Sequence, residues 1–177
     1  MSKIFDLKKL SDDKTFLIVA DCKLYDTAKY EYGDGLFKYY EWADIITIFI
    51  NKYTDNTLND IRNVLSNKEL LGKRGVLLYV DDISNKELAK ELANKNKDLI
   101  IGFICDKIID ENYLNIKIID EYKDNMELDT NILLVGNSIF NSKNPKESTT
   151  YFKGWPTLSK KYKQQNQSLT QSMIKEI

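Results

Sequence analysis

The spacing of apolar residues divides the chain into alternating predicted strands and helices. Short unbroken apolar runs predict buried strands at residues 16–20, 45–50, 76–80, 99–104, 116–119 and 131–135. Apolar residues three and four positions apart predict helices at residues 2–10, 25–32, 36–42, 56–65, 85–94 and 146–164. Because strands alternate with helices, we expect an α/β fold with a mostly parallel sheet and right-handed crossovers.

A charged cluster follows the first predicted strand. Asp21, Lys23 and Asp26 are spaced Asp-x-Lys-x-x-Asp directly after the apolar run at 16–20. The carboxyl ends of strands carry the chemistry in α/β folds, so these three residues are the candidate catalytic cluster. The simpler alternative is that Asp21 and Lys23 form a salt bridge at a strand end and Asp26 caps the following helix.

Composition narrows the classes of function. The 177 residues suffice for one domain, which we place at 1–163, followed by a polar C-terminal tail at 164–177. The net charge of −1, from 26 basic and 27 acidic residues, argues against a nucleic-acid-binding surface built on gross charge. The chain has no histidine, which removes the commonest general base and metal ligand.

The remaining candidate chemistry is sparse. Cys22 and Cys105 are far apart, and we interpret them as two reduced thiols. We expect no metal and no cofactor, and we interpret the Asp81–Asp82 pair as part of a solvated loop. The N-terminus lacks an apolar signal core and no apolar run is long enough to span a bilayer, so we predict a cytoplasmic protein without membrane contact.

The stretch at residues 15–44 resembles the orotidine 5'-monophosphate decarboxylase family. That family carries Asp-x-Lys-x-x-Asp after its third barrel strand, and Asp21, Lys23 and Asp26 match it. Further family positions are matched by Gly35, Phe37, Lys38, Trp42, Ala43 and Asp44, and by segments 74–80, 97–104, 132–136 and 153–155. The resemblance covers most of the chain, from Phe5 to Tyr162.

The resemblance implies a TIM-type (β/α) barrel. Members of the family have eight strands, whereas this sequence predicts six, which correspond to the third and later strands. We therefore expect an N-terminally truncated, incomplete barrel of about six mostly parallel strands with flanking helices.

The resemblance also implies roles for individual residues. The counterpart of Lys23 supplies a proton to the carbon that loses carbon dioxide, and the counterpart of Asp21 lies beside the departing carboxylate. In the family, a further lysine from an earlier strand completes the array, and this chain has no counterpart of it. Gly136 is followed by Asn137 where the family has a phosphate-binding arginine, which indicates a degenerate phosphate site.

These departures favour a catalytically inactive relative that serves as a binding or structural component through protein–protein contact. One alternative is an active decarboxylase of UMP synthesis, a carboxy-lyase of pyrimidine biosynthesis, whose site is completed by a partner chain. Another alternative is a small-molecule or nucleotide binder. We expect a homodimer, or a complex with another protein, built near the aromatic residues Tyr30, Tyr39 and Tyr40.

Overall fold

The computed structural model describes residues 2–25, 29–35, 37–119 and 130–153. The helices are α1 (Ser2–Lys14), α2 (Tyr39–Trp42), α3 (Thr54–Asn67), α4 (Lys86–Lys95) and α5 (Asn137–Phe140), with a π-helix at Lys29–Asp34 and a 3-10 helix at Ile83–Asn85. The strands are β1 (Val19–Leu24), β2 (Ile45–Phe49), β3 (Gly75–Val80), β4 (Ile100–Cys105), β5 (Leu114–Ile119) and β6 (Ile132–Val135).

The strands follow one another in the sheet in the order β1-β2-β3-β4-β5-β6. The pairings from β1 to β5 are all parallel, for example Ile45 opposite Gly75 and Val80 opposite Cys105. Consecutive parallel neighbours joined by helices are the arrangement of a (β/α) barrel. The sheet has β1 and β6 at its two ends, so the expected incomplete TIM-type barrel of six strands is confirmed.

The described residues divide between two compact units. The first contains the chain up to Lys117 together with Thr130–Ile132, and the second contains Ile118, Ile119 and the described residues from Leu133 onward. The first unit therefore holds β1 to β4, and the second holds most of β6 and all of α5.

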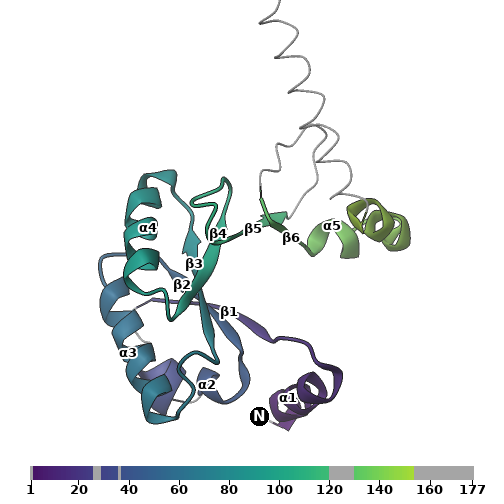
Figure 1. Ribbon diagram of the computed structural model, residues 1–177. Coiled ribbons are helices and arrows are strands. Elements are labelled where there is room, and N and C mark those ends of the chain that lie inside the picture. Colours follow the sequence, from purple (N-terminus) through teal and green to yellow (C-terminus); the bar gives the residue numbers. More distant parts are fainter. Residues whose placement is uncertain (1, 26–28, 36, 120–129, 154–177) are drawn as a thin grey trace, which may run out of the picture. The chain divides into compact units, whose positions relative to one another are not determined.

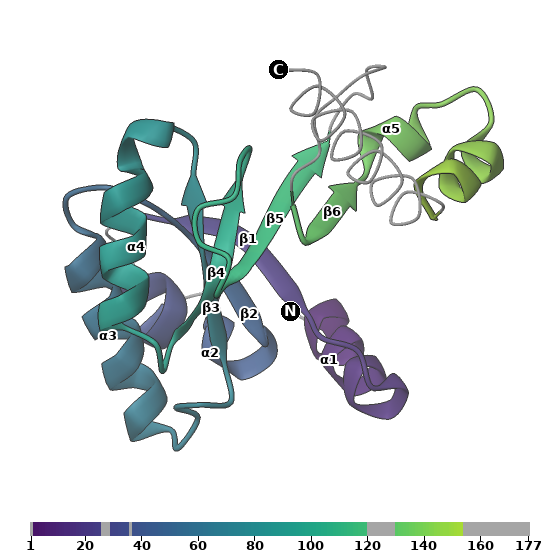
Figure 2. The same cartoon turned by 45° about the horizontal axis from the view of Figure 1, so that its top comes forward.

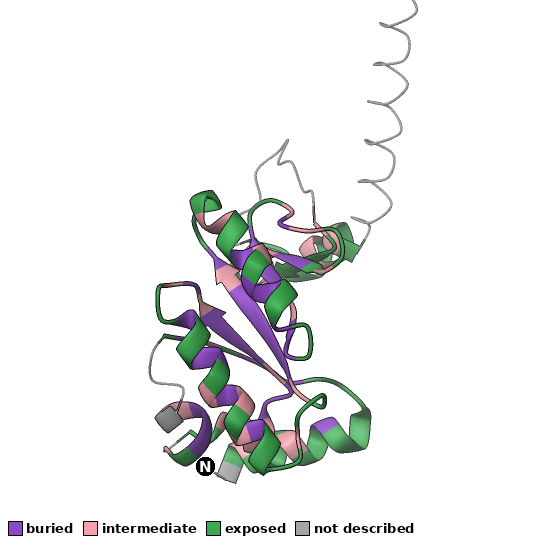
Figure 3. Ribbon diagram, turned by 60° about the vertical axis from the view of Figure 1, so that its left-hand side comes forward, coloured by how far each residue is buried: buried purple, intermediate pink, exposed green. Residues whose placement is uncertain are grey.

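Helices α3 and α4 cover one face of the sheet in the first unit (Figures 1 and 2). Burial is concentrated in the strands and in the helix surfaces that contact them (Figure 3). Side chains alternate between the faces of a strand, so every second residue of β2 and β3 packs under these helices. The buried cluster at this interface includes Ile46, Ile48, Leu58, Ile61, Leu65, Val76, Leu78, Ala89 and Leu92.

A buried carboxylate joins the segments that precede the strands. Asp44 directly precedes β2, and its Oδ2 accepts a hydrogen bond from the backbone N–H of Ile18 at 2.9 Å. Its Oδ1 accepts from Lys8 Nζ at 3.2 Å and from Arg74 Nη1 at 3.1 Å. Asp44 thereby connects α1, the entry to β1 and the entry to β3, which fixes the starts of three successive strands.

The predicted position of the first strand is wrong. The strand β1 runs Val19–Leu24 instead of 16–20, and Leu17 is 70% exposed. An unbroken apolar run indicates a strand buried on both faces, whereas in β1 the buried Ala20 and Leu24 alternate with exposed residues. Asp21 and Lys23 consequently lie inside the strand rather than after its end.

The predicted helices need smaller corrections. The pattern predicts Leu88, Ala89 and Leu92 as inward residues of α4. Ala89 and Leu92 are buried together with Ala93, whereas Leu88 is exposed. The helix predicted at 36–42 is shortened to α2, and that at 25–32 is replaced in its described part by the π-helix. Positions 145–153 are helical, and the rest of the predicted terminal helix and the tail at 164–177 lie outside the described residues.

Candidate functional site

The two charged residues of the sequence cluster that the structure describes lie in an irregular part of β1. Ala20 pairs with Ile46 and Leu24 pairs with Ile48, so Asp21, Cys22 and Lys23 all lie opposite Thr47. This excess of residues on one strand is a β-bulge, a feature that re-aims side chains and is over-represented beside active sites. Asp26, the third predicted catalytic residue, lies outside the described residues.

Thr47 contacts every residue of the bulge. Its Oγ1 donates a hydrogen bond to Asp21 Oδ1 at 2.9 Å and accepts one from the backbone N–H of Lys23 at 2.8 Å. Its carbonyl oxygen accepts from the Cys22 thiol at 3.6 Å. Sequence reasoning did not identify Thr47, and the one available signal was a hydroxyl within the apolar run at 45–50.

The side chains of Asp21 and Lys23 lie side by side on the sheet. Lys23 Nζ is 3.8 Å from Asp21 Oδ2, with the Lys23 side chain 44% and the Asp21 side chain 50% exposed. Exposed ion pairs of this kind contribute only about 0–1 kcal/mol to stability. The salt bridge that the simpler alternative predicts is therefore present, and it adds little to the stability of the fold.

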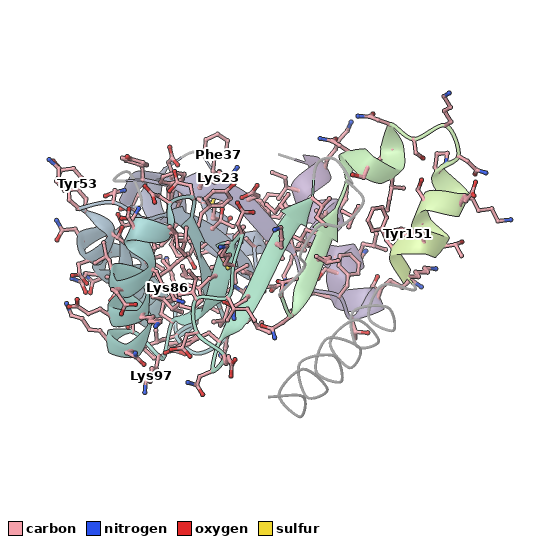
Figure 4. All side chains as sticks on the ribbon, turned by 90° about the horizontal axis from the view of Figure 1, so that it is seen from above. Lys23, Phe37, Tyr53, Lys86, Lys97 and Tyr151 are labelled. Carbon is pink, nitrogen blue, oxygen red and sulfur yellow. The ribbon has the colours of Figure 1, made fainter. Side chains whose placement is uncertain are left out.

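Aromatic rings lie beside the ion pair. Lys23 Nζ is 4.7 Å from the centre of the Tyr79 ring, a distance that permits a cation–π interaction. The Phe49 and Tyr79 rings are stacked with centres 5.5 Å apart, and the Tyr25 ring lies 5.9 Å from that of Phe49. Figure 4 shows Lys23 at the rim of the first unit. The ammonium thus borders a row of three aromatic rings contributed by β2, β3 and the end of β1.

The cysteines do not suit nucleophilic chemistry. Both are free thiols, and burial raises the pKa of Cys22. Burial likewise raises the pKa of Cys105 to about 11. Since the thiolate is the nucleophile and the metal ligand, neither side chain is activated at neutral pH.

The strand ends of β3 and β4 border an open cleft of about 570 Å³. It is lined by Val80, Asp81, Asp82, Ile83, Cys105, Asp106, Lys107 and Ile109. Hydrogen bonds from Ser84 lower the pKa of the Asp82 carboxyl, so Asp82 acts as the cap of the 3-10 helix. Among the described residues, no group of three or more His, Cys, Asp or Glu side chains is arranged to hold a metal ion.

Gly136 and Asn137 lie in the second unit, where β6 ends and α5 begins. Gly136 is the N-terminal cap of α5, which spans only Asn137–Phe140. A helix of one turn contributes little dipole, and Asn137 carries no charge with which to hold a phosphate.

A helix that crosses a bilayer must be long and predominantly apolar. None of the helices in the described ranges is both long and apolar enough to do so.

Comparison with known proteins identifies similar proteins over part of the chain. No family model matches the chain. The orotidine 5'-phosphate decarboxylase of Candida tropicalis is 32% identical over 117 residues, which cover 59% of this chain and 42% of that protein. That of Pachysolen tannophilus is 34% identical over 115 residues, covering 58% and 41%. The uridine 5'-monophosphate synthase of Naegleria gruberi is 30% identical over 110 residues, covering 56% of this chain and 22% of that protein.

Over more than half of its length, this chain is similar to proteins named orotidine 5'-phosphate decarboxylase or uridine 5'-monophosphate synthase. It spans about two fifths of the length of the curated decarboxylases that it matches. The family resemblance carried by the Asp-x-Lys sequence is thus supported by an independent comparison. Within the described residues, the structure places Asp21 and Lys23 of that sequence together on one bulge.

Proposed function

We propose that this chain is a member of the orotidine 5'-phosphate decarboxylase family that does not decarboxylate orotidine 5'-monophosphate and acts as a binding component. The observation that carries the proposal is the position of the Lys23 ammonium. In the family resemblance this group is the proton donor, and here it lies over the Tyr79 ring and beside Asp21. An ammonium held over an aromatic ring must leave that ring before it can approach an anionic substrate.

The phosphate position supports the same proposal. Asn137 stands where the family resemblance places an arginine, and a charge-assisted hydrogen bond is typically worth about 1.5–3 kcal/mol. Enzymes use the binding energy of such remote groups to stabilise the transition state at the reacting centre. Replacing the guanidinium by a neutral amide removes part of that energy.

The purified chain is expected to leave orotidine 5'-monophosphate unchanged. The test follows the ultraviolet absorbance of the substrate at high protein concentration, where decarboxylation would lower it. Lys23→Ala is the control, because any residual contaminating activity persists in that variant. Turnover by the unmodified chain that disappears in Lys23→Ala would contradict the proposal.

A second candidate function is an active decarboxylase completed by another chain. It is favoured by the Asp21–Lys23 pair, which lies close together, and by the relatives, which are named decarboxylases. If a second copy completed the site, the rate would rise more steeply than the protein concentration. The same absorbance assay, repeated over a dilution series, therefore separates the two candidates.

The proposed partner is a second copy of this chain. Phe37 is exposed and stacks on Tyr39 with ring centres 5.7 Å apart, and Tyr39 packs against Trp42 at 5.4 Å. Aromatic side chains are enriched at interfaces, and twofold pairing is the commonest form of homo-oligomer. The side chain of Tyr30, which was predicted to join this surface, lies outside the described residues.

We expect Phe37→Asp to convert a homodimer into a monomer in sedimentation experiments across a concentration series. An aspartate in an apolar interface would be desolvated without a partner, which strongly disfavours association. Tyr53→Asp is the matched control, because Tyr53 is also an exposed aromatic residue and projects at a different place (Figure 4). A chain that is monomeric before substitution, or a dimer that survives Phe37→Asp, would refute this proposal.

A further inference from the structure

We propose that Thr47 is the positioning residue of the Asp21–Lys23 pair. Its hydroxyl, acting across the β-bulge, determines where the Lys23 ammonium and the second oxygen of Asp21 lie. The inference deepens the proposed function, on which it rests for the role of this pair as a binding site. Its test needs no ligand and no activity.

The burial of Thr47 is the first argument. Thr47 is fully buried in the middle of β2, between the apolar residues Ile46 and Ile48. A buried hydroxyl is costly unless it is hydrogen-bonded, and valine would fill the same volume without that cost. The Thr47 hydroxyl uses both its donor and its acceptor capacity on the bulge, donating to Asp21 and accepting from Lys23. Both hydrogen bonds of the Thr47 hydroxyl are thus made to residues of the bulge.

The backbone of Lys23 is the second argument. Its φ of 46° is in the left-handed region, which is unfavourable for a residue other than glycine and persists only where the surroundings hold it. Residues of a bulge are left out of the regular ladder, so their backbone groups need other partners. The Thr47 oxygen accepts the Lys23 N–H at 2.8 Å and thereby supplies that partner. The hydroxyl stabilises the turn that directs the lysine side chain.

The two oxygens of Asp21 are the third argument. Thr47 engages Oδ1 at 2.9 Å, and Oδ2 is the oxygen that lies 3.8 Å from Lys23 Nζ. One hydroxyl therefore fixes the carboxylate rotamer and the lysine backbone together. A site supported in this way by a packed strand is held more tightly than one formed by loops. The pair presents a positioned cation and a positioned acceptor to whatever binds.

The test measures the Lys23 side chain by nuclear magnetic resonance in the unliganded full-length chain. The ε-methylene protons of Lys23 should be shifted upfield by the Tyr79 ring, and Tyr79→Leu assigns that shift by abolishing it. We expect Thr47→Val to remove most of the upfield shift, because it keeps the shape of the residue and deletes the hydroxyl. Thr47→Ser, which retains the hydroxyl, should keep most of it.

Thr54→Val is the matched control. Thr54 is buried, its hydroxyl accepts from the Asn51 backbone N–H at 2.8 Å, and it takes no part in the bulge. The Thr54→Val variant should have lower thermal stability but unchanged Lys23 resonances. This control therefore separates positioning of Lys23 from a general loss of stability. If Thr47→Val does not fold, Thr47→Cys provides a second variant of similar size with a much weaker hydrogen-bonding group. An unchanged Lys23 shift in either folded variant would overturn the inference.

Discussion

Replacing Asp44 with alanine is expected to lower the free energy of unfolding by about 3–5 kcal/mol, because it removes one partner of a buried ion pair. The side chains of Asp44 and Arg74 are only 10% and 14% exposed, and Nη1 of Arg74 lies 3.1 Å from the carboxylate. The Arg74 Nε is buried and has no hydrogen-bond partner. Loss of Asp44 would therefore leave a largely buried guanidinium without its counter-ion.

The loss would extend beyond the ion pair. The backbone N–H of Ile18 donates to Asp44 Oδ2 at 2.9 Å, and this amide would be left without that acceptor. Lys8 Nζ would lose its contact with Asp44 and retain the exposed Asp12. An unpaired buried polar group costs about 1–3 kcal/mol by itself. The unpaired Ile18 amide and the unpaired Arg74 guanidinium would therefore both lower the free energy of unfolding.

Urea denaturation followed by circular dichroism measures this effect. Asp55→Ala is the matched control, since Asp55 forms an exposed ion pair with Lys95 and its loss should cost about 1 kcal/mol or less. Asp44→Asn separates charge from hydrogen bonding, because the amide still accepts from Ile18. An Asp44→Ala variant as stable as Asp55→Ala would show that Asp44 does not stabilise the strand entries.

The sequence predicts the central strands well for a physical reason. The runs at 45–50, 76–80 and 99–104 correspond to β2, β3 and β4, and each is offset by no more than one residue at either end. Strands in the middle of a parallel sheet are covered on both faces. Side chains on both faces are therefore buried, and the strand appears in the sequence as an unbroken apolar run. In β1 exposed and buried residues alternate, with Val19 and Asp21 exposed and Ala20 and Leu24 buried, so the apolar run at 16–20 does not mark this strand.

The candidate site could be predicted in its residues but not in its geometry. The Asp-x-Lys spacing identifies Asp21 and Lys23, whereas the bulge that contains them depends on how β1 pairs with β2. Pairing register is a tertiary property, because a bulge satisfies its backbone groups through residues far away in the sequence. Thr47 is separated from Lys23 by 24 positions, and no local pattern connects them.

The buried face of α4 shows a related limit of prediction from the sequence. Helical periodicity predicts Leu88, Ala89 and Leu92 on the inward side of α4, whereas the buried residues are Ala89, Leu92 and Ala93. Small residues allow a helix to approach the sheet closely, so the alanines face inward and Leu88 is displaced to the exposed edge of the stripe. A hydrophobicity pattern weights leucine above alanine, and it therefore includes Leu88 in the buried face and omits Ala93.

Substituting Gly102 with alanine is expected to destabilise the chain by about 1–3 kcal/mol or more, as overpacking of a well-packed site does. A Cβ at Gly102 would first clash with the Leu114 carbonyl oxygen, and it would lie 2.7 Å from the Leu114 Cβ. The first of these atoms belongs to the backbone, so a change of side-chain rotamer cannot relieve the contact. Strand β5 would have to move away from β4 at the position where Gly102 pairs with Leu114.

Gly75→Ala provides the matched control in the same sheet. A Cβ at Gly75 would meet only side-chain atoms of Ile101, at 3.0–3.3 Å, and these can move. Chemical denaturation should therefore rank Gly102→Ala well below Gly75→Ala in stability. Hydrogen exchange should show faster exchange in Gly102→Ala for the amides that join β4 and β5, while those joining β2 and β3 stay protected. Equal stability of the two variants, or equal exchange across both strand pairs, would mean that β4 and β5 are not packed as closely as described.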